Sequence, residues 1–176
     1  MSMMRKIFRP GAGAVHKRFV AAFVNATTSY RGDAAIWDST PPTDQGASGV
    51  LEGKTLGAND FIYVTICPAT IANSHGLHAG VYEGKSIGDT DTVNNLLDDS
   101  LAIVQTWGIH DTVRTVDDTV AAKALLIAST TAGALADAAT STLEGQMVGV
   151  AMTADTTYTR GTVTAYCVTG FVRCDY

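Results

Sequence analysis

Short apolar runs alternate with glycine, proline or polar breaks along most of the chain, a pattern typical of β-strands joined by turns. The clearest run is FIYVTI at 61–66, in which every residue is β-branched or aromatic. Because its consecutive positions are apolar, it predicts a strand buried on both faces. Pro68 ends this run, and a turn at 73–74 leads to another predicted short strand over 75–82.

The pattern becomes more regular after residue 100. Residues 101–107 and 109–117 flank Gly108 and predict two strands, the second half-exposed because polar and apolar residues alternate along it. Residues 120–128 have the length of a strand, which is the preferred interpretation. A helix is the alternative for this segment, since one side of it would carry Ala121, Ala124, Leu125 and Ala128. Residues 129–133 predict a turn.

Three further elements complete the predicted second half. Residues 134–137 predict a short strand that pairs with the preceding one. Residues 147–153 predict a strand in which Gly149 marks a bulge or a close backbone approach. Residues 157–172 predict one long strand or a hairpin that turns near Gly161.

The first hundred residues give weaker signals. Residues 15–30 combine a helical spacing of apolar positions with β-rich composition, and a strand is preferred. Gly32-Asp33 predicts a turn. Residues 38–60 form the longest polar stretch and predict a surface loop that contacts a neighbouring molecule. Residues 91–100 predict a short helix with an aspartate cap.

These elements together predict an all-β fold, a small β-barrel or sandwich with long loops. We expect residues 1–14 to form an extended N-terminal arm, which could reach about 45–50 Å. A single β-rich domain is expected over 15–176. Its first part would cover 15–100 and its second part, a barrel, 101–176.

Charge is sparse and unevenly distributed. Charged residues make up 16% of the chain against 46% hydrophobic residues, and domains average about 25% charged. A surface so poor in charge indicates contact with neighbouring molecules in an assembly. Five basic residues lie in the first 18 positions, and these are the predicted contact residues: Arg5, Lys6, Arg9, Lys17 and Arg18.

The remaining chain holds 7 basic against 17 acidic residues, a net charge of −10. A basic arm on an acidic body predicts that the arm meets an acidic partner. The acidic body would repel phosphate, so we expect no direct contact with nucleic acid. No run of about 18 apolar residues occurs, and Phe19–Val24 is too short for the apolar region of a signal peptide. We therefore expect neither a membrane span nor export by a cleaved signal.

Candidate chemistry is scarce. His75 and His78 have a metal-like spacing but lack the further ligands of a tetrahedral site. The acid pairs at 98–99 and 117–118 suit solvated turns, because neighbouring strand residues face opposite sides, although calcium binding at a subunit interface is conceivable. Cys67, Cys167 and Cys174, odd in number and widely spaced, predict reduced thiols. The sequence predicts neither enzymatic activity nor a cofactor or metal.

The segment from 106 to 172 resembles the small head-decoration, or capsid cement, proteins of tailed bacteriophages. The resemblance rests on Trp107-Gly108, the runs AAKALL at 121–126, STTAG at 129–133 and GQMVGVAM at 145–152, and a closing Thr/Val-rich strand. The preceding hundred residues depart from that family, whose N-terminal segment is short.

The resemblance implies a non-enzymatic virion protein that binds the exterior of a capsid after synthesis in the host cytoplasm. It implies a homotrimer that bridges subunits of the major capsid protein and stabilises the shell against the pressure of packaged DNA. Another virion role, in the tail, fibre base or shell, is the alternative. A different class of function is a cell-surface binding module acting through Arg31-Gly32-Asp33.

Overall fold

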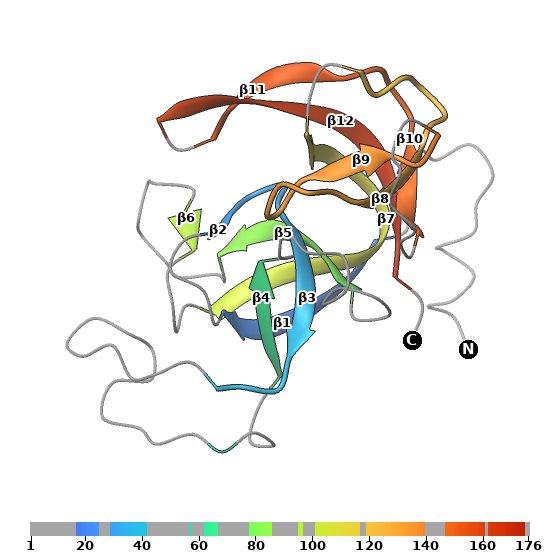
Figure 1. Cartoon of the computed structure of the whole chain (residues 1–176). Coiled ribbons are helices and arrows are strands. Elements are labelled where there is room, and N and C mark those ends of the chain that lie inside the picture. Colours follow the sequence, from blue (N-terminus) through green and yellow to red (C-terminus); the bar gives the residue numbers. More distant parts are fainter. Residues whose placement is uncertain are drawn as a thin grey trace, which may run out of the picture.

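The structure is a computed structural model of the chain, shown in Figure 1. It describes residues 17–24, 29–41, 57, 62–66, 78–85, 95–96, 101–116, 119–139, 147–160 and 162–174. Every regular element within them is a strand, which confirms the predicted all-β class. The strands are β1 (Arg18–Val24), β2 (Ser29–Tyr30), β3 (Ala34–Asp38), β4 (Tyr63–Ile66), β5 (His78–Lys85), β6 (Asn95–Leu96), β7 (Leu101–Thr115), β8 (Leu125–Ala128), β9 (Leu135–Asp137), β10 (Met147–Ala151), β11 (Thr156–Arg160) and β12 (Val163–Arg173).

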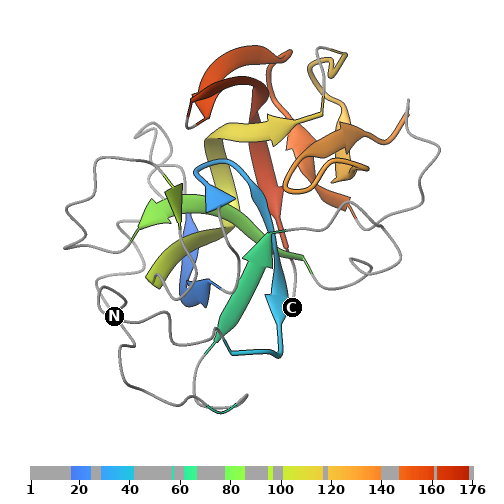
Figure 2. The same ribbon diagram turned by 60° about the vertical axis from the view of Figure 1, so that its left-hand side comes forward.

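Five strands close into a barrel, one of the two all-β arrangements that the sequence predicted. Their order is β1-β4-β3-β5-β7, and β7 returns to pair with β1. A second ring of pairings runs β7-β9-β8-β10-β12 and closes where β12 pairs with β7. Strand β11 lies outside both rings and pairs with the first part of β12, and β2 and β6 form a separate pair (Figures 1 and 2).

Strand β7 belongs to both rings and organises the fold. Its first half pairs antiparallel with β1, from Leu101 to Trp107, and its second half pairs with β12 up to Thr115. The prediction of two strands flanking Gly108 is therefore wrong, because one strand of 15 residues runs through this glycine. Gly108 has a φ of 105°, which a residue without Cβ adopts readily, so the strand bends there without ending.

Two apolar cores lie on opposite faces of β3. Ala35 faces the core inside the barrel, with Val64 and Tyr82 among its other members. Ala34 and Ile36 face the second core, which is built mainly from strands of the second ring. Successive residues of a strand point to opposite faces, so β3 is buried on both. This places the two rings in direct contact.

Two sequence predictions need correction. Asn95 and Leu96, within the predicted helix over 91–100, form β6 and pair with β2; the other residues of that prediction lie outside the described part. The amphipathic pattern here is short, and helices of a few residues have little stability by themselves. Hydrogen bonding to β2 therefore decides the conformation of these two residues. The strand predicted over 120–128 is limited to Leu125–Ala128, and a turn precedes it.

Other predictions are confirmed. Strand β4 lies within 61–66, and the 157–172 segment forms the β11–β12 hairpin. The pairing of β10 with β8 shifts register between Met147 and Gly149, which is the predicted bulge. A Cβ at Gly149 would overlap the carbonyl oxygen of Phe171, so the backbones also approach closely there. No helix able to cross a membrane is found in the part of the chain that was searched.

Candidate functional site

The predicted basic contact residues divide into two groups. Arg5, Lys6 and Arg9 lie outside the described residues. Lys17 immediately precedes β1, and its Nζ lies 3.9 Å from Oε1 of Glu83. Arg18 is the exposed first residue of β1. The structure therefore locates the end of the predicted basic segment on the outside of the barrel.

Arg18 belongs to a cluster that the sequence did not reveal. The strand register places Trp107 of β7 opposite Arg18 of β1 on one side and opposite Arg173 of β12 on the other. The guanidinium carbons of Arg18 and Arg173 lie 5.9 and 5.8 Å from the centre of the indole ring. Phe171 packs edge-on against the same indole at 5.1 Å and 80°. We call Arg18, Trp107, Phe171 and Arg173 the basic–aromatic surface.

The basic–aromatic surface has the properties of a binding site. Each guanidinium within about 6 Å of an indole is held by a cation–π interaction, so the two charges have defined positions. Arginine offers several N–H donors in a planar fork, which suits carboxylates. Both arginines are exposed and the indole is half-buried. The arrangement can therefore recognise an acidic partner with an apolar component, without any chemical step.

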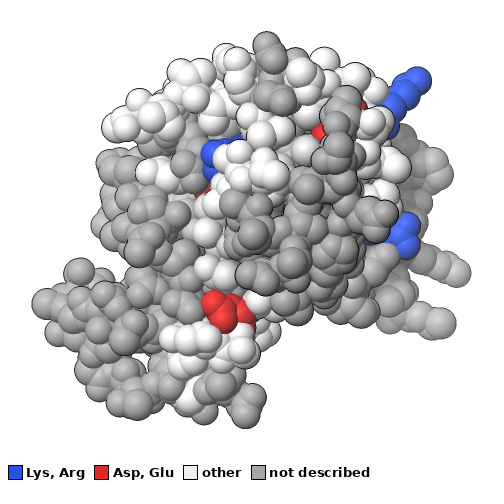
Figure 3. Space-filling model, in the orientation of Figure 1, with Lys and Arg blue, Asp and Glu red and all other residues white. Residues whose placement is uncertain are grey.

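The rest of the described surface offers little competing charge on the face seen in Figure 3. There the Lys, Arg, Asp and Glu atoms are few and scattered among other residue types. Several large apolar side chains are also half-exposed: Phe19, Ile62, Leu125, Met147, Met152 and Val163. This agrees with the low charge content of the sequence.

A second cluster surrounds the buried imidazole of His110. Its Nε2 lies 2.7 Å from Oε2 of Glu83, and its Nδ1 accepts a hydrogen bond from the backbone N–H of Thr112 at 3.1 Å. A hydrogen on Nε2 is compatible with both contacts. The guanidinium of Arg31 pairs with the carboxylates of Glu83 and Asp111. The cluster thereby links β5, β7 and the turn before β3.

The charges of this cluster are balanced internally. Ligand atoms of Glu83, His110 and Asp111 lie within 4.8 Å of one another, as a metal site would require. Arg31 already pairs with both carboxylates, and its positive charge opposes a cation at that place. We interpret the cluster as a structural ion-pair network. The sequence could not identify it because Arg31 and Asp111 are 80 positions apart.

The network also changes carboxyl ionisation. Burial alone would raise the pKa of Glu83, but the hydrogen bond from His110 and the charges of Arg31 and Lys17 outweigh it and lower that pKa. Burial likewise opposes ionisation of Asp111, and Arg31 outweighs it, so the pKa of Asp111 is also lowered. Both carboxylates therefore favour the folded state when ionised.

We predict that part of the fold's acid sensitivity resides in Glu83. The pKa of Glu83 is lower in the folded state than in the unfolded state, where it is about 4.3. Its ionised carboxylate therefore stabilises the fold fully above that unfolded pKa. This stabilisation is lost as pH falls through the folded pKa. The difference in unfolding free energy between wild type and Glu83→Gln should therefore shrink as pH falls below about 4. Urea titrations across this range measure it, and a difference independent of pH would contradict the prediction.

The Arg31-Gly32-Asp33 tripeptide is built into the fold. The carboxylate of Asp33 is fully buried; it accepts a hydrogen bond from the N–H of Tyr30 at 3.0 Å and pairs with Arg114 Nη1 at 3.3 Å. Gly32 has a φ of 93°, and a Cβ there would overlap the carbonyl oxygen of Thr112. A receptor that reads this tripeptide needs an accessible carboxylate, so this geometry does not favour adhesion.

The remaining sequence candidates give no assembled chemical site. His78 is buried in β5, and His75 lies outside the described residues, as do the acid pairs at 98–99 and 117–118. Cys167 and Cys174 are both buried thiols, and Cys67 also lies outside the described residues. Burial raises the pKa of Cys167, and a hydrogen bond with Thr156 opposes this only in part. The raised pKa disfavours the reactive thiolate.

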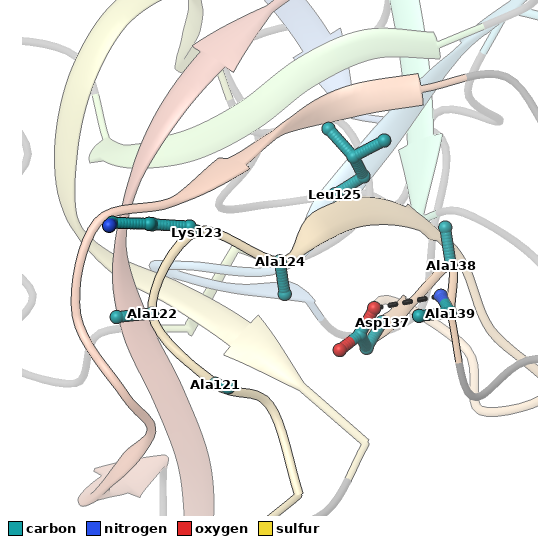
Figure 4. A pocket seen from close by; sticks show the side chains of 8 residues that line it. All are labelled: Ala121, Ala122, Lys123, Ala124, Leu125, Asp137, Ala138 and Ala139. Carbon is teal, nitrogen blue, oxygen red and sulfur yellow. Dashed lines mark hydrogen bonds between the residues drawn. The ribbon is translucent and has the colours of Figure 1, made fainter.

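An open pocket of about 510 Å³ lies beside β8 (Figure 4). Methyl groups dominate its wall, which is formed by Ala121, Ala122, Lys123, Ala124, Leu125, Asp137, Ala138 and Ala139. Oδ1 of Asp137 accepts a hydrogen bond from the backbone N–H of Ala139 at 2.8 Å. The lining offers space for a small apolar group and no paired groups for acid–base chemistry.

No protein-family model, curated protein or solved structure matches the chain.

Proposed function

We propose that the chain is a structural protein of a tailed-bacteriophage virion that binds the outer surface of the capsid and stabilises it by bridging major coat subunits. The observation that carries the proposal is the basic–aromatic surface. Arg18, the last of the five N-terminal basic residues, lies beside Trp107 on the outside of the barrel, and Arg173 flanks the same indole. The basic N-terminal segment thus leads directly to a surface suited to an acidic partner.

Charge distribution favours a protein partner for this surface. Beyond residue 18 the chain has a net charge of −10, so extended contact with nucleic acid would be repulsive. A carboxylate-bearing protein surface needs contact with only a few guanidinium groups and one aromatic ring. Arginine and tryptophan are the residue types that most often dominate the binding energy of protein interfaces.

Capsid binding also fits the remaining character of the fold. The described surface is poor in charge, and the clusters of ionisable groups are satisfied within the chain rather than arranged for catalysis. A homotrimer on the capsid would engage several coat subunits at once, so modest contacts could give high avidity. A tail, fibre-base or shell role would use the same surface and remains the second candidate.

Capsid binding by Arg18→Glu and by a chain lacking residues 1–14 tests this proposal. Both should bind shells of the coat protein encoded in the same genome at least about tenfold more weakly than wild type, because each removes positive charge facing an acidic partner. Cosedimentation of the purified protein with those shells measures the affinity. Trp107→Ala should show a similar loss, since it removes the group that positions both arginines.

Lys123→Glu is the matched control for Arg18→Glu. It makes the same change in net charge at an exposed position just before β8 that is not part of the basic–aromatic surface. It should leave shell binding unchanged. Wild-type binding by Arg18→Glu and by the truncated chain would overturn the proposed site, and failure of the wild-type chain to bind shells would overturn capsid decoration.

A further inference from the structure

A row of apolar side chains crosses four neighbouring strands of the second ring. The strand register places Ile109 of β7 opposite Phe171 of β12. Phe171 in turn lies opposite Val150 of β10, and Val150 lies opposite Leu125 of β8. Directly opposite residues on adjacent strands share a face, so the four side chains lie side by side. We call them the apolar row, and at about 4.8 Å between strands it spans roughly 14 Å.

The apolar row faces away from the core. Leu126, Ala151 and Val172 each follow a member of the row along its strand, and all three belong to the second core. Successive residues of a strand point to opposite faces, so the row lies on the outer face. Leu125 is 48% exposed, and the other three members are half-buried. A contiguous apolar strip on an outer face is typical of an interaction surface.

The row is continuous with the basic–aromatic surface. Trp107 precedes Ile109 by two positions on β7, and Arg173 follows Phe171 by two positions on β12. Residues two apart on a strand share a face, so these pairs lie on the same outer face. Phe171 belongs to both groups, because it also packs edge-on against the indole of Trp107. The two groups therefore form one surface.

Positive charge lies at one end of this surface. Arg18 and Arg173 flank the indole at the β7–β12 end. Asp111, further along β7, pairs with Arg31, so its charge is balanced within the chain. Lys123 precedes β8, but its side chain points away from that strand (Figure 4). A complementary partner therefore carries carboxylates near the two arginines and apolar side chains over the rest.

The strand pairing favours a helix as the partner. β8, β10 and β12 each lie between two other strands, so their backbone groups are already used for pairing. An extended segment laid across this face would gain no backbone hydrogen bonds from it, whereas a helix satisfies its own backbone internally. Apolar positions at i, i+3, i+7 and i+10 of a helix span about 15 Å, which matches the length of the row.

We propose that the apolar row and the basic–aromatic surface together bind one amphipathic helix that carries carboxylates at one end of its apolar stripe. The carboxylates meet Arg18 and Arg173, and the apolar stripe covers Phe171, Val150 and Leu125. The assignment of this helix to the major coat subunit rests on the proposed function. The helix itself follows from the surface alone.

Leu125→Thr with Val150→Thr tests the apolar row without changing charge. Cosedimentation with shells of the coat protein should show binding at least about fivefold weaker than wild type, because apolar contact area is lost. Ile62→Thr with Val163→Thr is the matched control. It makes the same kind of change at two exposed apolar positions outside the row, and it should bind as wild type does.

Salt separates the two parts of the surface. The loss in the double threonine variant should stay constant from about 0.05 to about 0.5 M salt, whereas the loss in Arg18→Glu should shrink, because salt screens charges and not apolar contacts. Leu125→Thr alone changes an exposed position, so it should keep the fold and lose about twofold. A double variant that binds as tightly as its control would overturn the row and leave the arginine contact of the proposed function intact.

A synthetic peptide tests the helix without shells. The probe carries leucines at helical spacing and two glutamates at one end of the leucine stripe; a peptide of the same composition with its leucines scattered is the control. The described elements of the chain are all strands, so a gain of helical circular dichroism on mixing reports the bound peptide. The gain should occur with the striped peptide only and should weaken at least about fivefold in the double threonine variant.

No binding of the striped peptide, binding without a helical gain, or equal binding of the scattered peptide would overturn the inference. A wild-type chain that binds the striped peptide but no shells would instead overturn capsid decoration and leave the helix site standing. The two failures are therefore distinguishable.

Discussion

Replacing Gly80 with alanine should lower the unfolding free energy by about 3–5 kcal/mol, enough to threaten a fold of ordinary stability. Gly80 lies in β5 with a φ of 148°, which side-chain-bearing residues rarely adopt. A Cβ there would overlap the backbone carbonyl oxygen of Gln105 and lie 2.9 Å from Cγ1 of Val104. The obstructing atom is backbone of the central strand β7, so it cannot rotate away.

Gly84 provides the matched control for this prediction. It lies four residues later in the same strand with a φ of 149°, and a Cβ there would meet no atom within 4 Å. Gly84→Ala therefore carries the conformational strain alone, about 1–2 kcal/mol. Urea denaturation of the two variants isolates the cost of the collision. Equal losses would show that β7 is not held against Gly80 as closely as the structure indicates.

Asp33→Ala should destabilise the fold by about 3 kcal/mol, because removing one member of a buried ion pair leaves the other unpaired. The carboxylate is fully buried, and the Arg114 side chain is 16% exposed. The change also removes the acceptor for the N–H of Tyr30, the last residue of β2. Arg114 would keep its hydrogen bond to the carbonyl of Ala132 at 2.8 Å, but that oxygen carries no full charge.

Two further variants show whether the lost stability comes from the charge of Asp33 and from its burial. Asp33→Asn keeps an acceptor oxygen for Tyr30 while removing the charge, so its loss should fall between wild type and alanine. Asp111→Ala removes another aspartate that pairs with an arginine, but its side chain is 66% exposed and the loss should stay below about 1 kcal/mol. If Asp33→Ala were no more destabilising than Asp111→Ala when measured by urea denaturation, burial would not be the source of the effect.

Local sequence signals were sufficient where they were strong and self-contained. The β-branched and aromatic run at 61–66 predicted β4. The two-residue alternation near the C-terminus predicted either one long strand or a hairpin, and the β11–β12 hairpin is the one that forms. Strand β3 was not predicted, because AAIW at 34–37 is rich in alanine, which has low β-propensity. The fold uses small residues there because β3 is packed on both faces between the two cores.

The candidate site depended on information that a single sequence does not display. The basic N-terminal residues were visible as a composition shift, but Trp107 and Arg173 join Arg18 through strand register alone. The same holds for Asp33 and Arg114, which are separated by 81 positions. Barrel closure through β7 likewise requires knowing which strands are neighbours, since periodicity identifies faces and not partners.

The position of β7 has a consequence for the time at which the chain can fold. The first ring lacks its closing strand until synthesis has passed residue 107, and the second until it has passed Arg173. Closure then depends on contacts between segments that are far apart in the sequence. The entropy cost of bringing these segments together must be met before their contacts stabilise the fold. Closure of the two rings should therefore be slow, and the first ring can close before the second.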